Sequence, residues 1–185
     1  MSEELLTLHE KIVECQLCRL SESRRNAVPG EGAFDTSLML VGEAPGRNED
    51  LLGRPFVGAA GAFLSDLLSS IGVERTKVFI TNIVKCRPPM NRAPRVDEVK
   101  ACQPYLQRQI SLIDPKIICL MGNNAISAVL GKGYPISEMH GKRVQTVDRC
   151  FFVTYHPAAA LYMSELKETM TKDFKVLSDI LKSVS

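Results

Sequence analysis

The stretch Ser37-Leu-Met-Leu-Val-Gly-Glu-Ala-Pro-Gly46 joins a short apolar run to a turn bounded by two glycines. Runs of four or five residues without polar alternation are typical of strands covered on both faces, as in a parallel sheet. Three more runs of this form follow along the chain, so we predict four strands in a mainly parallel sheet. The four runs are residues 37–41, 78–81, 117–121 and 151–155.

Apolar residues at helical spacing separate and flank these runs, and Gly72 and Gly131 provide plausible helix ends. Pro104 suits the first position of a helix and so divides one region into two helices. Alternation of strands and helices predicts a three-layer α/β/α sandwich around a four-stranded, mainly parallel sheet, with residues 1–185 as one domain. A candidate antiparallel partner of the last strand contains Val144 and Thr146. The predicted helices cover residues 5–12, 63–71, 96–103, 105–113, 124–130 and 166–181.

Composition excludes several classes of protein. The chain has 185 residues, of which 45% are hydrophobic and 24% charged, and its net charge is +2. These values argue against a disordered chain, a collagen-like repeat and a disulfide miniprotein. The longest apolar run, residues 56–64, is about half of the roughly 18 residues that suggest a membrane span. The segment Met1-Ser-Glu-Glu4 does not begin a secretion signal, so we expect a cytoplasmic protein without membrane contact.

The carboxyl ends of parallel strands meet at one edge of the sheet, where such folds bind their ligands. The predicted strands lead to Glu43, to Asn82, to Asn123 with Asn124, and to His156. A carboxylate, an amide and an imidazole would therefore converge, which indicates a ligand site. The alternative is that strand ends are polar because they reach water.

The six cysteines indicate a metal site, because a reducing compartment disfavours disulfides. Cys119 and Cys150 lie in apolar runs and are predicted to be core residues. The other four suit one iron–sulfur cluster or one zinc ion, and their spacing does not separate these two groups. The alternative is that only the C-x-x-C pair matters. The four cysteines are Cys15, Cys18, Cys86 and Cys102.

Three further segments are candidates for contacts with a base or with DNA. Phe56 stands in a loop between two glycines, where its ring covers the core or offers a stacking surface. Residues 85–108 carry six basic side chains against two acidic ones, which indicates phosphate contacts or a solvated face. The turn after His156 leads to Leu161 and Tyr162, which either wedge between bases or begin the packing of the last helix.

Taken together, these motifs resemble those of the family 4 uracil-DNA glycosylases, the iron–sulfur branch of the uracil-DNA glycosylase superfamily. The resemblance runs from Cys15 to Leu161, nearly the whole chain. It implies the superfamily's three-layer fold and a [4Fe–4S] cluster on the four cysteines named above, with zinc as the minor alternative. The matching pieces are Gly42-Glu-Ala-Pro-Gly46 with Glu49-Asp50, Gly53-Arg-Pro-Phe-Val-Gly58, Thr81-Asn-Ile-Val-Lys-Cys-Arg-Pro-Pro89, His156-Pro157 and the cysteine spacing.

The reaction that the resemblance implies is hydrolysis of the N-glycosidic bond of deoxyuridine in DNA, which releases free uracil and leaves an abasic site for base excision repair. The uracil must first leave the base stack. By resemblance, Phe56 stacks on the base, while Asn82 donates to O4 and accepts from N3–H. Glu49 is expected to block the 5-methyl group of thymine. His156 is expected to stabilise negative charge on O2. The turn formed by Glu43, Ala44 and Pro45 is expected to bind uracil through its backbone.

Further expectations concern the contacts with DNA and the partners. By resemblance, Leu161 is expected to press into the duplex. A monomer is the default expectation for an enzyme of this size, and its function would associate it with the nucleoid. Residues 179–185 contain no clear sliding-clamp peptide, so a clamp partner is not indicated. Phosphate contacts are expected from Lys85, Arg87, Arg92 and Arg95.

One position of the first motif differs from the family 1 enzymes, in which an Asp positions the attacking water. That place is Ala44 here, and the nearest carboxylate is Glu43. The implied mechanism is therefore dissociative, with Glu43 as a lesser candidate for holding the water. One alternative is a protein that binds uracil-containing DNA without turnover, although the extra histidine of covalently trapping relatives is missing from residues 90–95. The other alternative is a metal-stabilised domain that binds a small molecule.

Overall fold

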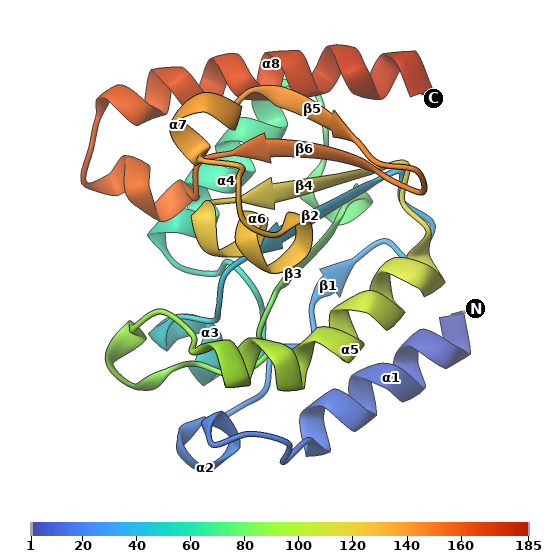
Figure 1. The fold of residues 1–185 in the computed structure, drawn as a ribbon, viewed down its shortest axis with the longest axis vertical. Helices are drawn as coiled ribbons and strands as arrows, with labels where there is room; N and C mark the ends of the chain where they lie inside the picture. Colours follow the sequence, from blue (N-terminus) through green and yellow to red (C-terminus); the bar gives the residue numbers. More distant parts are fainter. Residues whose placement is uncertain (1, 185) are drawn as a thin grey trace.

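The computed structural model describes residues 2–184 and is built on one mixed sheet with the strand order β1-β3-β2-β4-β6-β5 (Figure 1). Its four central strands are mutually parallel and correspond to the four predicted ones. A short antiparallel strand extends the sheet at each edge. The one that contains Val144 confirms the predicted partner of the last strand, whereas the one beside β3 was not predicted. The strands are β1 (Glu31–Gly32), β2 (Leu38–Gly42), β3 (Phe79–Asn82), β4 (Ile117–Met121), β5 (Lys142–Gln145) and β6 (Cys150–Thr154).

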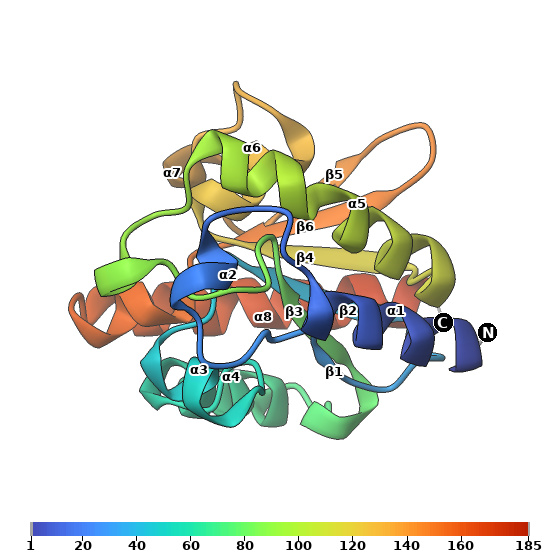
Figure 2. The ribbon, with the colours of Figure 1, turned by 90° about the horizontal axis from the view of Figure 1, so that it is seen from below.

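Helices cover both faces of the sheet and confirm the three-layer α/β architecture (Figure 2). One face packs against α1 (Ser2–Glu14), α5 (Val96–Ile113) and α6 (Asn123–Leu130). The other face packs against α4 (Ala59–Ser70) and α8 (Glu165–Val184). The remaining helical segments are α2 (Leu20–Ser23), α3 (Arg47–Leu52), α7 (Ile136–Met139), η1 (Arg75–Lys77), η2 (Pro89–Asn91) and η3 (Pro157–Leu161).

The central strands are mostly apolar because alternate residues enter different cores. In β2, Met39 and Val41 pack on the α1 and α5 side, whereas Leu38 and Leu40 pack on the α4 and α8 side. A strand that buries both faces has no polar alternation, which is why its sequence is a continuous apolar run. Cys119 of β4 and Cys150 of β6 are buried in these layers, so the core assignment of both thiols is confirmed.

The predicted break at Pro104 is wrong, because α5 continues through this residue. A proline inside a helix removes one backbone hydrogen bond and costs about 3 kcal/mol. The Pro104 ring lies on the exposed side of α5, while Cys102 and Leu106 are buried beneath the helix. Burial of the opposite face therefore holds the helix together across the proline.

The four parallel strands point the same way, so the segments that follow β2, β3 and β6 lie together beyond the carboxyl ends of the strands (Figure 1). This is where parallel α/β folds bind ligands. Within residues 2–184, no helix has both the length and the apolar character that a membrane span requires.

Candidate active site

A cleft of about 360 Å³ opens at the carboxyl ends of the parallel strands. Its volume is in the range typical of small-molecule sites. The cleft brings together every residue for which a uracil contact was predicted, although these residues come from four separate segments of the chain. Those lining residues are Glu43, Ala44, Pro45, Glu49, Phe56, Asn82 and His156.

Gly42, the last residue of β2, leaves room for the side chains of Asn82 and Phe56 to pack against the backbone at the base of the cleft. A Cβ atom at Gly42 would lie 2.5 Å from Asn82 Oδ1 and 2.7 Å from Phe56 Cζ. Both distances are shorter than real Cβ contacts, so a larger residue would displace the amide or the ring. Gly61 leaves room for the Phe56 backbone, since a Cβ there would lie 1.8 Å from the Phe56 carbonyl oxygen. The absence of side chains at these two glycines therefore allows Phe56 and Asn82 to occupy their places in the cleft.

Asn82 presents an unsatisfied acceptor to the cleft. The residue is 1% exposed, and its Oδ1 is the one buried side-chain polar atom without a hydrogen-bond partner in the part of the chain that the structure describes. Leaving a buried acceptor unpaired costs about 1–3 kcal/mol, so such an atom in a cleft indicates a ligand that donates to it.

His156 follows β6 and lies beside Phe56, with ring centroids 5.5 Å apart and planes inclined by 29°. Its Nδ1 accepts a hydrogen bond from the backbone N–H of Ala158 at 3.2 Å. Burial lowers the pKa of His156 to about 4, against a smaller opposing effect of Glu49. The neutral ring therefore carries its proton on Nε2, because Nδ1 is used as an acceptor.

Glu49 organises the loops around the cleft. One carboxylate oxygen accepts from the backbone N–H of Gly46 at 3.1 Å, and the other accepts from Val57 and Gly58 at 2.9 and 3.0 Å. The carboxylate thus ties the turn after β2 to the loop that carries Phe56, whose φ of 51° is unusual for a bulky residue. This tethering was not predicted from the sequence.

Glu43 differs from Glu49, because its carboxylate makes no hydrogen bond or ion pair with any residue in the range 2–184 while its residue lines the cleft. Asn123 and Asn124 do not join the site. The Asn123 Oδ1 accepts instead from the backbone N–H of Ile136, at the start of α7. The end of β4 therefore does not contribute to this cleft, whereas the ends of β2, β3 and β6 do.

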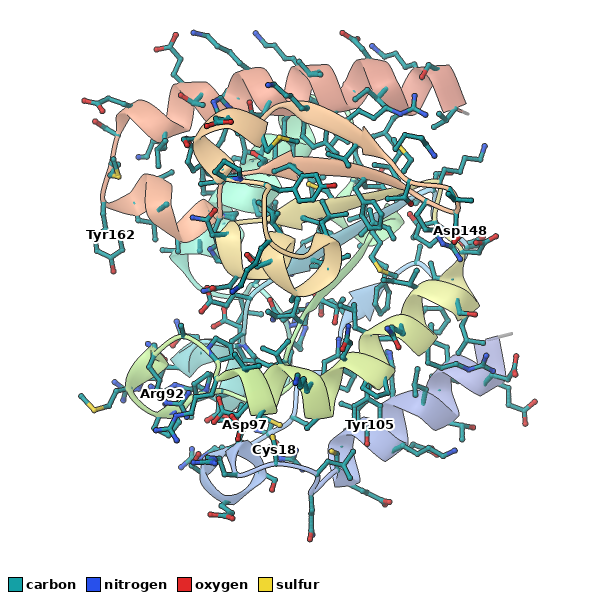
Figure 3. All side chains as sticks on the ribbon, viewed as in Figure 1. Cys18, Arg92, Asp97, Tyr105, Asp148 and Tyr162 are labelled. Carbon is teal, nitrogen blue, oxygen red and sulfur yellow. The ribbon has the colours of Figure 1, made fainter. Side chains whose placement is uncertain are left out.

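Large apolar side chains are exposed on both sides of the cleft. Leu161, Tyr162 and Met163 follow His156, and Met90 projects from η2 with 94% of its surface exposed. Tyr162, directly after η3, and Arg92, directly after η2, both line the cleft. Figure 3 shows them on the same side of the molecule.

The predicted DNA-contacting arginines lie around η2, at the rim of the cleft. Arg87 donates to Asn91 Oδ1 at 2.7 Å, and Arg95 is exposed at the start of α5. Arg92 is engaged with the buried Glu98 through two hydrogen bonds of 2.7 and 2.9 Å. This pairing holds the pKa of Glu98 at about 2, against the opposing effect of burial.

The predicted phosphate contact of Lys85 is wrong. Lys85 is 1% exposed, and its ammonium donates to Thr81 Oγ1, the Asn82 carbonyl oxygen and Gln109 Oε1 at 2.6 to 2.8 Å. A buried ammonium whose three protons are all used cannot reach a DNA phosphate. Burial also lowers its pKa to about 8, while Cys102 and Cys86 act in the opposite direction.

The four cysteines predicted as ligands line one small cavity between α1, α2 and α5, where Figure 3 labels Cys18. No group of three histidine, cysteine, aspartate or glutamate side chains in residues 2–184 is arranged to hold a metal ion. The donor set still fits a thiolate-bound group, because N–H groups point at three of the sulfurs and favour thiolates. These donors are Leu17 N to Cys15 at 3.5 Å, Arg24 Nη1 to Cys86 at 2.9 Å and Lys85 N to Cys102 at 3.2 Å.

In the free-thiol form burial works against this role, since it raises the pKa of Cys86 and raises that of Cys102 to about 11. Arg24 opposes the effect at Cys86, and Lys85 opposes it at Cys102. Arg24 was not predicted, and its only sequence signal is its place in the Arg24-Arg25 pair shortly after Cys18.

Comparison with known proteins agrees with this geometry. Residues 29–180 match the family model of the uracil DNA glycosylase superfamily. The chain is 46% identical to the type-4 uracil-DNA glycosylase of Sulfurisphaera tokodaii, over 96% of this chain and 85% of that protein. It is 42% identical to the type-4 enzyme of Archaeoglobus fulgidus over 96% and 94% of the two chains. With the type-4 enzyme of Thermotoga maritima it shares 38% identity over 97% and 96%.

Proposed function

The chain belongs to the uracil DNA glycosylase superfamily, and on that premise we propose that it excises uracil from DNA by hydrolysing the N-glycosidic bond of deoxyuridine. The products are free uracil and DNA with an abasic site, which base excision repair then processes. The observation that carries the proposal is the unpartnered Oδ1 of Asn82 in a cleft where His156 offers an Nε2–H.

Recognition of uracil follows from the amide of Asn82. Its Oδ1 accepts from the uracil N3–H, and its amide group donates to O4. Cytosine presents an acceptor at N3 and a donor at C4, so each of these contacts would be mispaired. A site that leaves its buried polar groups unpaired rejects the wrong base strongly. Phe56 supports the base through its ring, and Glu49 holds the Phe56 loop where a thymine methyl group would clash.

His156 acts on the leaving group. When the bond between C1′ and N1 breaks, its electron pair passes to the uracil, and much of the charge collects on O2. The neutral imidazole donates from Nε2 to this oxygen, and the Ala158 N–H on Nδ1 holds the ring in the required tautomer. A preorganised donor of this kind stabilises developing charge without rearrangement in the transition state.

Water completes the reaction at C1′ of the oxocarbenium-like sugar, forming the new C–O bond and losing a proton to solvent. Ala44 supplies no carboxylate, so bond cleavage precedes the attack of water. Glu43 is the cleft-lining carboxylate without a hydrogen-bond partner among residues 2–184, and it holds this water. Its contribution is secondary to that of His156.

Contacts with the DNA come from the rim. Arg87, Arg92 and Arg95 lie around η2 and attract the phosphates, while Leu161 fills the space that the flipped base leaves in the duplex. The chain acts as one domain and as a monomer in the cytoplasm.

Cys15, Cys18, Cys86 and Cys102 hold a [4Fe–4S] cluster in this proposal, which the shared cavity and the N–H donors to sulfur support. When bound, the cluster supplies a covalent cross-link between the N-terminal segment and α5. A zinc ion is the alternative occupant, and it would leave the protein colourless instead of brown.

The test of the proposed function is excision from a labelled oligonucleotide with one deoxyuridine, followed by alkali to cleave abasic sites. Oligonucleotides with thymine or cytosine at the same position serve as controls. Cleavage at uracil alone is the expected result. Retention of the uracil oligonucleotide in a complex without release of uracil would favour the DNA-binding alternative and contradict the enzymatic reaction.

A further inference from the structure

The buried ammonium of Lys85 has no carboxylate partner among the residues that the structure describes. Its three acceptors are a hydroxyl, an amide and a carbonyl oxygen, at 2.6, 2.7 and 2.8 Å. Burying a charge is costly even when every proton is used. An apolar side chain in its place would leave those three acceptors buried and unpaired, so the reason for the buried charge lies in the groups that it binds.

The acceptors indicate that reason. The carbonyl oxygen belongs to Asn82, the residue whose side-chain Oδ1 faces the cleft unpaired, and the hydroxyl belongs to the preceding Thr81. Lys85 therefore holds both residues at the carboxyl end of β3. The amide of Asn82 can discriminate between bases only if its backbone is fixed at that strand end.

The ammonium is itself fixed to the rest of the fold. Gln109, in the C-terminal part of α5, accepts from Lys85 and donates to the Pro29 carbonyl oxygen at 2.8 Å. Thr81 Oγ1 donates to that same oxygen at 2.8 Å. The network thus joins α5, β3 and the loop before β1 around one charge.

The backbone of Lys85 reaches the cysteine cavity. Its N–H donates to Cys102 Sγ at 3.2 Å, and Cys86 is the next residue. One residue consequently contacts the cysteine cavity through its backbone and the base-recognition residue through its side chain. Lys85 is therefore the shortest connection in this segment between the cysteines and Asn82.

We propose that Lys85 is a positioning residue for base recognition, which orients Asn82 through its backbone and links that orientation to the cysteine cavity. This inference rests on the proposed excision of uracil. It assigns to Lys85 a part in specificity that its position in a basic segment does not suggest.

The experiment compares Lys85→Met with the wild-type holoprotein and with Thr36→Val. Thr36 is 8% exposed and donates to the Leu38 and Lys77 carbonyl oxygens, near the amino end of β2. Thr36→Val therefore removes buried hydrogen bonds far from the cleft and controls for general loss of stability. The measurements are kcat/KM for uracil excision, inhibition by free uracil, binding of free uracil by calorimetry, visible absorbance and Tm.

We expect Lys85→Met to lower kcat/KM by about 10²-fold, the loss that a misplacement of about 1 Å can cause. It should also weaken the binding of free uracil. Thr36→Val should lower Tm and leave both properties unchanged. A folded Lys85→Met protein with wild-type excision and uracil binding would overturn the inference, and so would an equal loss in Thr36→Val at the same fall in Tm.

If Lys85→Met does not fold, Thr81→Val decides, since it removes one acceptor of the ammonium and substitutes neither Asn82 nor a cysteine. A loss of about tenfold in kcat/KM with weaker uracil binding supports the inference, and unchanged values overturn it. A different result would contradict the proposed function: wild-type protein that binds free uracil but does not excise it from DNA. In that case the calorimetric comparison still decides the role of Lys85.

Discussion

The Nδ1 atom of His156 accepts a hydrogen bond from the backbone N–H of Ala158, two residues further along the chain, at 3.2 Å. Because the acceptor belongs to the ring and the donor to the backbone, the ring proton must be on Nε2. The first turn of η3 thus determines which atom of His156 can donate into the cleft.

We predict that His156→Ala slows uracil excision by about 10²- to 10³-fold, the usual loss when one donor to a developing oxyanion is removed. Glu43→Ala should have a clearly smaller effect, because in a dissociative reaction the water adds after the difficult step. Single-turnover kinetics on a deoxyuridine duplex measure both. A larger loss in Glu43→Ala would move the main chemical contribution to that carboxylate.

The buried state of His156 predicts an unusual titration. Its pKa in the folded protein is about 4, below the ordinary value of 6.5, so the neutral ring persists well into the acid range. NMR titration, with His156→Gln to identify the resonance, should show this ring neutral at pH 5. A midpoint near 6.5 would contradict the lowering of the pKa by burial.

The same shift has a consequence for stability. The unfolded chain binds a proton at His156 below pH 6.5 and the folded chain does not, so the free energy of unfolding falls between pH 6.5 and about 4. The largest slope from one such group is about 1.4 kcal/mol per pH unit. Burial, with a smaller effect of Lys85, also lowers the pKa of His9 to about 4, which adds a second contribution of the same sign.

Asn82→Asp tests base recognition. The carboxylate has no N–H to donate to uracil O4 and repels that oxygen, so we expect uracil excision to fall by about 10³-fold or more. Weak excision of cytosine should appear, because its amino group can donate to the carboxylate. Asn124→Asp is the matched control, since Asn124 does not line the cleft. Wild-type excision of uracil by Asn82→Asp would remove the recognition role from this residue.

The parallel centre of the fold could be predicted from the sequence because its strands bury both faces and so appear as continuous apolar runs. The edge strand β1 could not, since Glu31–Gly32 pairs with β3 through its backbone and has no apolar pattern. The continuity of α5 through Pro104 depends on what the helix covers. That tertiary contribution outweighs the local preference of proline.

The meeting of Glu43, Asn82 and His156 in one cleft could be predicted because each follows or ends a strand of the parallel centre. Lys85 was misassigned because a lysine in a basic segment shows a charge but not the direction of its side chain. The tethering by Glu49 was missed for a related reason. Its partners, Gly46, Val57 and Gly58, are backbone groups that any residues at those positions would supply.

The cysteine cavity predicts a difference between a cysteine that lines it and a cysteine of the core. Cys18→Ala should remove the brown absorbance and lower Tm by about 10 °C, the shift for a loss of about 3–4 kcal/mol in a chain of this size. Cys119→Ala should keep the colour, because Cys119 lies in β4 within the core and only a small cavity results. Visible spectra and thermal melts of the two proteins measure this. Equal spectra would show that Cys18 is not a ligand.

The last prediction concerns the apolar rim. Leu161 is 44% exposed beside the cleft, whereas Val147 is 100% exposed in the segment between β5 and β6, close to Asp148 on the far side of the molecule (Figure 3). Holding a base out of a duplex costs a few kcal/mol, and a side chain that fills the vacated space offsets part of this cost. Leu161→Ala should therefore lower kcat/KM on duplex DNA by about tenfold, which corresponds to about 1.4 kcal/mol.

The same substitution should have little effect on single-stranded DNA, where the uracil is not held in a duplex. Val147→Ala removes an equally apolar exposed side chain far from the cleft and should leave both substrates unaffected. Excision assays with matched duplex and single-stranded oligonucleotides separate these cases. Equal losses on the two substrates would mean that Leu161 supports the cleft itself, since only a wedge distinguishes a stacked base from one that is already free.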